Sequence, residues 1–113
     1  MKIIFLMTLF LINFQVFAVE KTYKKNGTTY QLSLHQKLWV SSQCLQKCLA
    51  LKKPEVTTKT SYSSNPATEF CQKAKGKYLA VTDENGLPEG LCLFSDGSYI
   101  KAWDYYQKFK PNK

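Results

Sequence analysis

The chain has 113 residues with 16 lysines, eight acidic residues and no arginine, and its net charge is +8 at pH 7. This length predicts one domain. Lysine is a compact, hydrated charge without the planar guanidinium that pairs with phosphate and stacks on bases, so the composition disfavours specific nucleic-acid recognition. It is typical of a solvated lysine-rich exterior, or of attraction to anionic envelope surfaces.

The first 18 residues have the pattern of a secretory signal peptide. Lys2 precedes an apolar run from Ile3 to Phe17, and small or β-branched residues occupy the positions that a signal peptidase inspects. The run is interrupted by polar residues and is shorter than the roughly 20 apolar residues that span a bilayer, which makes an uncleaved anchor the weaker alternative. We expect cleavage after Ala18, which removes Lys2 and leaves a net charge of +7.

Export would place four cysteines in an oxidising compartment, where disulfides persist. Four cysteines allow three full pairings, and the sequence alone does not choose among them. Their spacing lacks the paired C-x2-C knuckles of zinc sites, so disulfides are favoured over metal binding. The four are Cys44, Cys48, Cys71 and Cys92.

The first segment of the expected mature chain, residues 19–64, should contain a hairpin, a short helix and a linker. Asn26-Gly27 is a strong two-residue hairpin signal because both residues tolerate positive φ. It predicts strands over Lys21–Lys25 and Thr28–Ser33.

A helix is expected over Ser42–Lys52. Ser42 is a suitable N-cap, Pro54 ends the helix, and the cysteines and leucines between them recur at helical spacing. Cys44 and Cys48 would then lie one turn apart, near the outer edge of disulfide geometry, so each could instead reach another element. The Ser/Thr-rich residues Glu55–Ser64 are expected to form the linker, or alternatively an edge strand.

The second segment, residues 65–113, has denser signals. Asn65 is a good N-cap and Pro66 suits the first helical position, so a helix should run from Pro66 to Lys75 and stop at Gly76 as its C′ residue. Strands are expected over Lys77–Thr82, Leu91–Ser95 and Ser98–Trp103, with a turn-rich connection over 83–90, a tight structural turn at Asp96-Gly97 and a helical turn over Trp103–Phe109.

These elements predict an α+β fold in which one helix packs on a three-stranded antiparallel meander. A bond between Cys71 on the helix and Cys92 in the middle strand would clamp helix to sheet. It would close a loop of about 22 residues and stabilise the fold by roughly 3 kcal/mol. The expected core residues are Phe70, Leu79, Val81, Leu93 and Ile100.

The stretch from Asn65 to Lys110 resembles a small bacterial secreted domain of unknown function whose members are often labelled haemolysins. The resemblance rests on an ordered pattern: Asn65-Pro66-Ala67, Cys71, Gly76, Gly90-Leu91-Cys92, Phe94, Asp96-Gly97, Trp103 and Tyr106. It leaves Val19 to Ser64 unexplained and implies no established activity.

The resemblance also bears on the disulfides. The family pattern has two further cysteines, at places that correspond here to Ile100 and a position near Lys110, as though one disulfide were lost. The remaining family pair maps to Cys71 and Cys92. Cys44 and Cys48 are then extra to the pattern, and the resemblance implies that they bond to each other.

No set of residues looks catalytic. A nucleophilic triad would depend on the single histidine, His35, which lies outside the family-like stretch. The carboxylates are scattered, and several occupy turns, where acids serve turn geometry. We expect no enzymatic activity and no cofactor. The carboxylates weighed are Glu69, Asp83, Glu84, Glu89, Asp96 and Asp104.

The candidate binding surface is a cluster of large amphipathic rings with a cation, a mixture found in interaction surfaces. Strand alternation would place Ile100 on the opposite, core face. The competing interpretation is that the tryptophan caps the sheet core. The cluster comprises Tyr99, Lys101, Trp103, Tyr105 and Tyr106.

Together these observations predict a non-enzymatic, disulfide-stabilised domain exported from a bacterial cell to the periplasm or beyond. Its expected role is a binding module for a protein or other component of the envelope, with contact to a membrane surface possible and its oligomeric state open. One alternative is a membrane-active, haemolysin-like protein acting through a helix at Ser42–Lys53. Another is an inhibitor of a secreted hydrolase acting through the loop Glu84–Glu89.

Overall fold

The computed structural model describes residues 19–44, 47–56 and 65–111. The expected signal peptide and its cleavage after Ala18 lie outside the described residues, as does most of the expected linker Glu55–Ser64.

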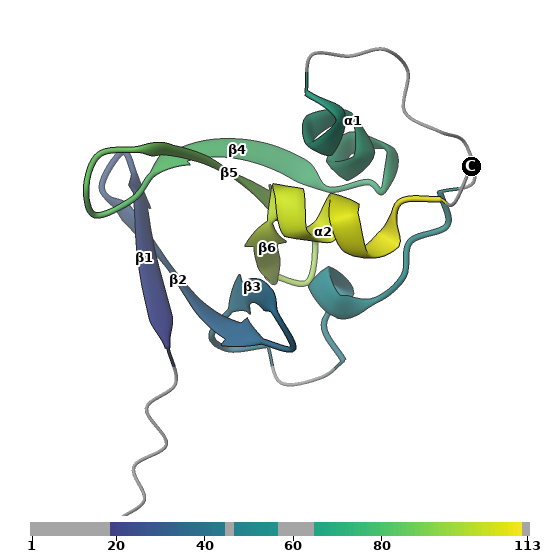
Figure 1. Ribbon diagram of the computed structural model, residues 1–113, viewed down its shortest axis with the longest axis horizontal. Coiled ribbons are helices and arrows are strands. Elements are labelled where there is room, and N and C mark those ends of the chain that lie inside the picture. Colours follow the sequence, from purple (N-terminus) through teal and green to yellow (C-terminus); the bar gives the residue numbers. More distant parts are fainter. Residues whose placement is uncertain (1–18, 45–46, 57–64, 112–113) are drawn as a thin grey trace, which may run out of the picture.

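Within the described residues, six strands form a closed barrel in which paired neighbours are antiparallel (Figure 1). The order around the barrel is β1-β2-β3-β6-β5-β4. Two helices and a 3-10 turn gather on one side of it (Figure 1). The elements are β1 Glu20–Lys25, β2 Thr28–His35, β3 Leu38–Ser41, η1 Leu49–Leu51, α1 Pro66–Lys73, β4 Lys77–Thr82, β5 Pro88–Leu93, β6 Tyr99–Lys101 and α2 Ala102–Phe109.

The predicted fold, one helix on a three-stranded meander, is therefore wrong. The strands β4, β5 and β6 do pair in meander order. However, β4 also pairs with β1 through Thr82 and Lys24, and β6 pairs with β3 through Ile100 and Val40. These two pairings close the sheet on itself.

The physical reason is that the meander is apolar on both faces. Leu91 and Cys92 are consecutive residues of β5 and both are fully buried, although successive side chains of a strand point to opposite faces. A helix covers only one face. The strands β1, β2 and β3 cover the other, and so a barrel forms.

The core accordingly has two layers. The barrel interior holds Tyr23, Leu32, Val81 and Leu91. The layer between barrel and helices holds Val40, Ala50, Ala67, Phe70, Cys71, Cys92, Ile100, Ala102 and Tyr105. The five expected core residues divide between these layers: Phe70 and Ile100 are in the outer one, whereas Val81 and the half-buried Leu79 and Leu93 face the interior.

The N-terminal hairpin is present, with Asn26 and Gly27 at φ 48° and 82° and β1 in register with β2. The strand β3 was not predicted. It follows a second tight turn at Gln36 and Lys37, which have φ of 50° and 69°. Neither residue is a usual carrier of positive φ, so the sequence has no turn signal there.

The expected helix over Ser42–Lys52 is not formed. Residues 45–46 lie outside the description, and the described part contains only the 3-10 turn η1, flanked by extended residues at Cys48 and Lys52. The backbone N–H groups of Leu49 and Ala50 donate to side chains of the β5–β6 turn instead of to a preceding helical turn.

The helix α1 matches its prediction closely at its start. The Asn65 side chain accepts from the backbone N–H of Thr68 at 3.1 Å, and Pro66 is the first helical residue. Its end differs, because the left-handed residue is Lys75, at φ 68°, and not Gly76.

The third predicted strand, Ser98–Trp103, is shorter than expected. The strand β6 ends at Lys101 and the helix α2 starts at Ala102, which places Trp103 on a helix. The second predicted strand, Leu91–Ser95, is shifted, because β5 begins at Pro88 and ends at Leu93.

Candidate functional site: a lysine-lined groove

Two disulfides hold the elements on the helical side of the barrel. Cys71 in α1 is bonded to Cys92 in β5, and Cys44 is bonded to Cys48 directly before η1. The Cα atoms are 5.7 Å apart in each pair. These are the two pairings that the family resemblance implied, and they are compatible with export to an oxidising compartment.

The turn between β5 and β6 holds η1 in place. Gly97 adopts φ 88° there, and the Asp96 carboxylate accepts from the Ser98 hydroxyl at 2.6 Å and from the Ser98 backbone N–H at 3.0 Å. Its second oxygen accepts from the backbone N–H of Leu49 at 2.8 Å. The buried Ser98 hydroxyl in turn accepts from the backbone N–H of Ala50 at 3.1 Å.

This network changes the ionisation of Asp96. Burial alone would raise the pKa of its carboxyl, but the hydrogen bonds from the Ser98 hydroxyl and from the backbone of Leu49 and Ser98 outweigh it, so the pKa is lowered below its usual value. Each donor favours the charged form. The turn therefore keeps a carboxylate that anchors η1.

A hollow of about 540 Å³ lies where η1, the end of α1 and the β5–β6 turn meet. We call it the lysine groove. Four lysines line it: Lys52 and Lys53 follow η1, whereas Lys73 and Lys75 lie at the end of α1. Glu55 is the acidic residue among its lining residues, and Lys73 forms an ion pair with Glu69 at 3.6 Å. The other lining residues are Leu49, Pro54, Ala74, Phe94, Ser95 and Tyr105.

The apolar part of the groove is continuous with the outer core. The ring of Phe94 packs on that of Tyr105 at 5.2 Å between centroids, and Tyr105 also contacts Phe70 at 5.4 Å and Phe109 at 5.3 Å. Burial raises the pKa of the Tyr105 phenol, so this residue stays uncharged at neutral pH. In Figure 1, α1 and η1 lie on either side of α2, which contributes Tyr105.

Residues 63–108 match the family described as Domain of unknown function (DUF333). The matched stretch, called the DUF333 segment below, contains α1, β4, β5 and β6, almost all of α2, and the Cys71–Cys92 disulfide. It supports a small domain of unknown function and gives no support to the haemolysin label. No curated protein and no solved structure matches the chain.

The DUF333 segment supplies only part of the lysine groove. Lys73, Lys75 and the aromatic floor lie within it, whereas Lys52, Lys53 and Glu55 come from the chain before it. The same holds for the barrel, because β1, β2 and β3 precede the segment. The groove thus exists only where the DUF333 segment meets the preceding part of this chain.

The predicted binding surface is divided by the structure. Tyr105 is 1% exposed and belongs to the core, so it cannot present itself to a partner in this fold. Tyr99 faces the barrel interior: its hydroxyl donates to the carbonyl of Gln31 and accepts from the Gln31 N–H, both at 3.2 Å, and its ring meets Tyr30 edge-on. Lys101 forms an ion pair with Glu89 at 3.4 Å.

Trp103 and Tyr106 remain together on the outside of α2. Their ring centroids are 5.5 Å apart, and Trp103 is 47% exposed. Tyr106 also packs on Phe70 at 5.7 Å, and the Lys110 ammonium lies 5.6 Å from its ring centre. Of the five predicted residues, Trp103 is exposed, Tyr105 is buried, and Tyr99, Lys101 and Tyr106 are half-buried.

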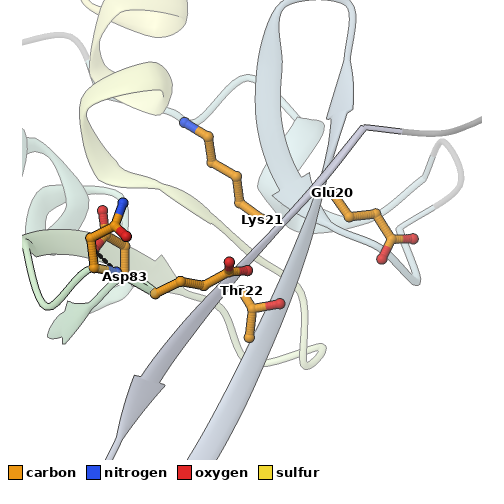
Figure 2. A pocket seen from close by; sticks show the side chains of 6 residues that line it. Glu20, Lys21, Thr22 and Asp83 are labelled. Carbon is orange, nitrogen blue, oxygen red and sulfur yellow. Dashed lines mark hydrogen bonds between the residues drawn. The ribbon is translucent and has the colours of Figure 1, made fainter.

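A second hollow, of about 210 Å³, lies between β1 and the β4–β5 loop (Figure 2). Two of its four charged side chains, those of Asp83 and Lys21, have other partners. The Asp83 carboxylate accepts from the N–H groups of Asn85 and Leu87 at 2.8 and 2.9 Å, and the Lys21 ammonium lies 4.5 Å from the Trp39 ring centre. In Figure 2 the side chains of Glu20 and Lys21 leave β1 in different directions.

Among the described residues, no group of three or more His, Cys, Asp or Glu side chains is arranged to hold a metal ion. His35 borders a hollow of about 250 Å³ with Gln36, Leu38, Leu51, Lys108 and Phe109. In the part of the chain that the structure describes, no helix is long and apolar enough to cross a membrane.

Sequence reasoning missed the lysine groove. Lys52 and Lys53 lie at the end of the helix that was expected over Ser42–Lys52 and is not formed. A signal was present, because each half of the groove carries two closely spaced lysines, but nothing local indicates that the two halves meet.

Proposed function

We propose that this protein is an exported, non-enzymatic binding module of the cell envelope and that the lysine groove holds its ligand. The observation that carries the proposal is the groove itself, which is lined by four lysines (one of them, Lys73, paired with Glu69), by one glutamate and by an apolar floor. Positive charge around an apolar recess favours an anionic ligand that also has an apolar part.

The groove is held rigidly, which supports a binding role. One wall is fixed by the Cys71–Cys92 disulfide and another by the hydrogen bonds from Leu49 and Ala50 to the β5–β6 turn. A site ordered before the ligand arrives loses less conformational entropy on binding. Export is supported by the two disulfides and by the signal-peptide pattern of the first 18 residues.

The test compares two variants of equal charge. The groove variant carries Lys→Gln at Lys52, Lys53, Lys73 and Lys75, and the control variant carries Lys→Gln at the exposed Lys24, Lys37, Lys77 and Lys108. Purified oxidised protein is mixed with isolated cell envelopes, and the bound fraction is measured. We expect about ten-fold weaker association for the groove variant only. Equal association of both variants and the unchanged protein would contradict the proposal.

A second candidate function, inhibition of a secreted hydrolase, is favoured by the β4–β5 loop. The Asp83 backbone N–H donates to the Leu87 carbonyl at 2.9 Å, and the Asp83 carboxylate accepts from the Leu87 N–H. Leu87 is nevertheless 60% exposed at the loop. A rigid loop with an apolar tip can enter a pocket at low entropic cost. The test is inhibition of secreted proteases and lysozymes, which Leu87→Asp should abolish while Leu34→Asp leaves it intact.

The membrane-active alternative has less support. It required an amphipathic helix over Ser42–Lys53, and in the described residues that stretch contains only the three-residue turn η1. Ala50 of this turn is fully buried against the barrel side. An interfacial helix must present a continuous apolar face to the bilayer, and η1 cannot do so.

A further inference from the structure

We infer that the ligand of the lysine groove is an acidic peptide segment of a partner protein, in which carboxylate side chains flank an apolar one. This inference rests on the proposed function and adds the chemistry of the partner to it.

The groove lysines come in two groups, one following η1 and one at the end of α1, so the cationic groups border the hollow from two separate segments. Lysine makes single-point contacts, whereas arginine grips one planar anion with two parallel hydrogen bonds. Separate ammonium groups therefore suit several carboxylates spaced along a chain.

The part of the apolar floor that a ligand can reach comes from Leu49 and Phe94, which are half-buried, whereas Tyr105 is 1% exposed and out of reach. The large apolar side chains that are exposed in the described residues, Val19, Leu34, Leu87 and Trp103, do not line the groove. A flat anionic membrane would touch the lysine tips without reaching the floor. A side chain projecting from a peptide can reach it.

Glu55 also lines the groove, together with the lysines. Its carboxylate is negatively charged and offers only acceptors, so it disfavours a ligand that is anionic throughout, such as polyphosphate. A peptide brings backbone N–H donors together with its carboxylates and can satisfy both signs of charge. The hollow of about 540 Å³ is within the range of 300–1,000 Å³ that is typical of ligand sites.

The test begins with a displayed library of short random peptides, from which those that bind the oxidised protein are selected. Peptides that also bind the groove variant are removed as unrelated binders. We expect the selected peptides to be enriched in Asp and Glu on both sides of an apolar residue. Enrichment of basic or uncharged peptides, or no enrichment over the groove variant, would overturn the inference.

The selected peptide is then made with a fluorophore and titrated by anisotropy, with inorganic polyphosphate and phosphatidylglycerol vesicles as competitors. We expect about ten-fold weaker binding when its apolar residue is replaced by Gly and when the protein is the groove variant, and little change for the control variant. Glu55→Gln should weaken the binding of the peptide by a few-fold and strengthen the binding of polyphosphate. This opposite response separates recognition of a peptide from general attraction to anions.

The outcomes distinguish the two proposals. If envelope binding depends on the groove lysines but polyphosphate or vesicles bind more tightly than any peptide, the peptide inference is wrong. The proposed function would still stand. Envelope association that does not depend on the groove lysines would overturn both. Circular dichroism and thermal melting of each variant show that a loss of binding does not come from unfolding.

Discussion

The carboxylate of Asp96 accepts a hydrogen bond of 2.8 Å from the backbone N–H of Leu49, 47 positions earlier in the chain. A residue that the sequence marks only as part of a tight turn thereby anchors the 3-10 turn η1, which leads into one wall of the lysine groove. Turn geometry, local helix structure and the candidate site are coupled through this one side chain.

The first prediction follows from that contact. Asp96→Ala removes the acceptor for Leu49 and for Ser98 and should lower the free energy of unfolding by about 1–2 kcal/mol, as the loss of a capping carboxylate does. Chemical denaturation measures it, with the exposed Glu84→Gln as a control that should change little. Unchanged stability of Asp96→Ala would show that solvent replaces the carboxylate without loss.

The same residue predicts a dependence on pH. Because the pKa of Asp96 is lower in the folded protein than in the unfolded chain, its stabilisation is present above the unfolded value of 3.8 and is lost as pH falls through the folded pKa. The difference in unfolding free energy between the unchanged protein and Asp96→Asn should therefore shrink in acid. A difference that is constant from neutral pH to acid would contradict this assignment.

The second prediction concerns Gly76. A Cβ atom built on this residue collides with the sulfur of Cys92 and lies 3.0 Å from the sulfur of Cys71, so Gly76→Ala must displace the disulfide or the chain around it. We expect a loss of about 1–3 kcal/mol in unfolding free energy. The cost should be smaller in a background with Cys71→Ala and Cys92→Ala, where the sulfurs are absent. An equal cost in both backgrounds would exclude the collision as its cause.

The third prediction compares the two disulfides. The bond between Cys71 and Cys92 spans 21 positions, whereas that between Cys44 and Cys48 spans four. Loop-closure entropy then predicts losses of about 3 and about 2 kcal/mol when each pair is replaced by alanine. Denaturant melts of the two double variants test the order. A larger loss of unfolding free energy on removal of the Cys44–Cys48 pair would contradict this order. It would indicate that this pair stabilises native contacts of η1.

The fourth prediction concerns alkaline pH. Burial, aided by the negative charges of Glu89, Asp83 and Asp104, raises the pKa of Tyr23 from 10.0 to about 12. For an acid whose folded pKa is raised, the stabilisation is complete below pH 10 and is lost as pH rises toward 12. A shift of two units corresponds to roughly 2–3 kcal/mol. In Tyr23→Phe the free energy of unfolding should depend less on pH between pH 10 and pH 12 than in the unchanged protein. A spectrophotometric titration of the tyrosine phenols in the folded protein tests the raised pKa directly.

Several elements could be predicted because short-range interactions decide them. Asn26-Gly27 forms a hairpin turn for its own conformational reasons, and Asn65 caps α1 through a hydrogen bond to a residue three positions later. The strand β4 has the bounds that its pattern indicated, Lys77–Thr82. Each of these signals lies within a few residues of the structure that it specifies.

Other features depend on distant parts of the chain. The turn at Gln36-Lys37 has no glycine, and the strand β3 that follows it becomes a strand by pairing with β2 and β6. The stretch around Cys48 has the pattern of a helix, yet its N–H groups find better-placed acceptors in Asp96 and Ser98. Local propensity is weak, at most about 1 kcal/mol per ordinary residue, and such contacts outweigh it.

The amino-acid sequence by itself determined the charge, the hairpin at Asn26-Gly27, the capped helix α1 and the stretch that matches DUF333. Only the tertiary structure decided that the sheet closes and that Tyr105 is buried. It also decided that Lys52 and Lys53 meet Lys73 and Lys75 around one hollow. The physical reason is that β5 is apolar on both faces, so the helices must cover one face and other strands the other. No local pattern in the sequence indicates which segments do so.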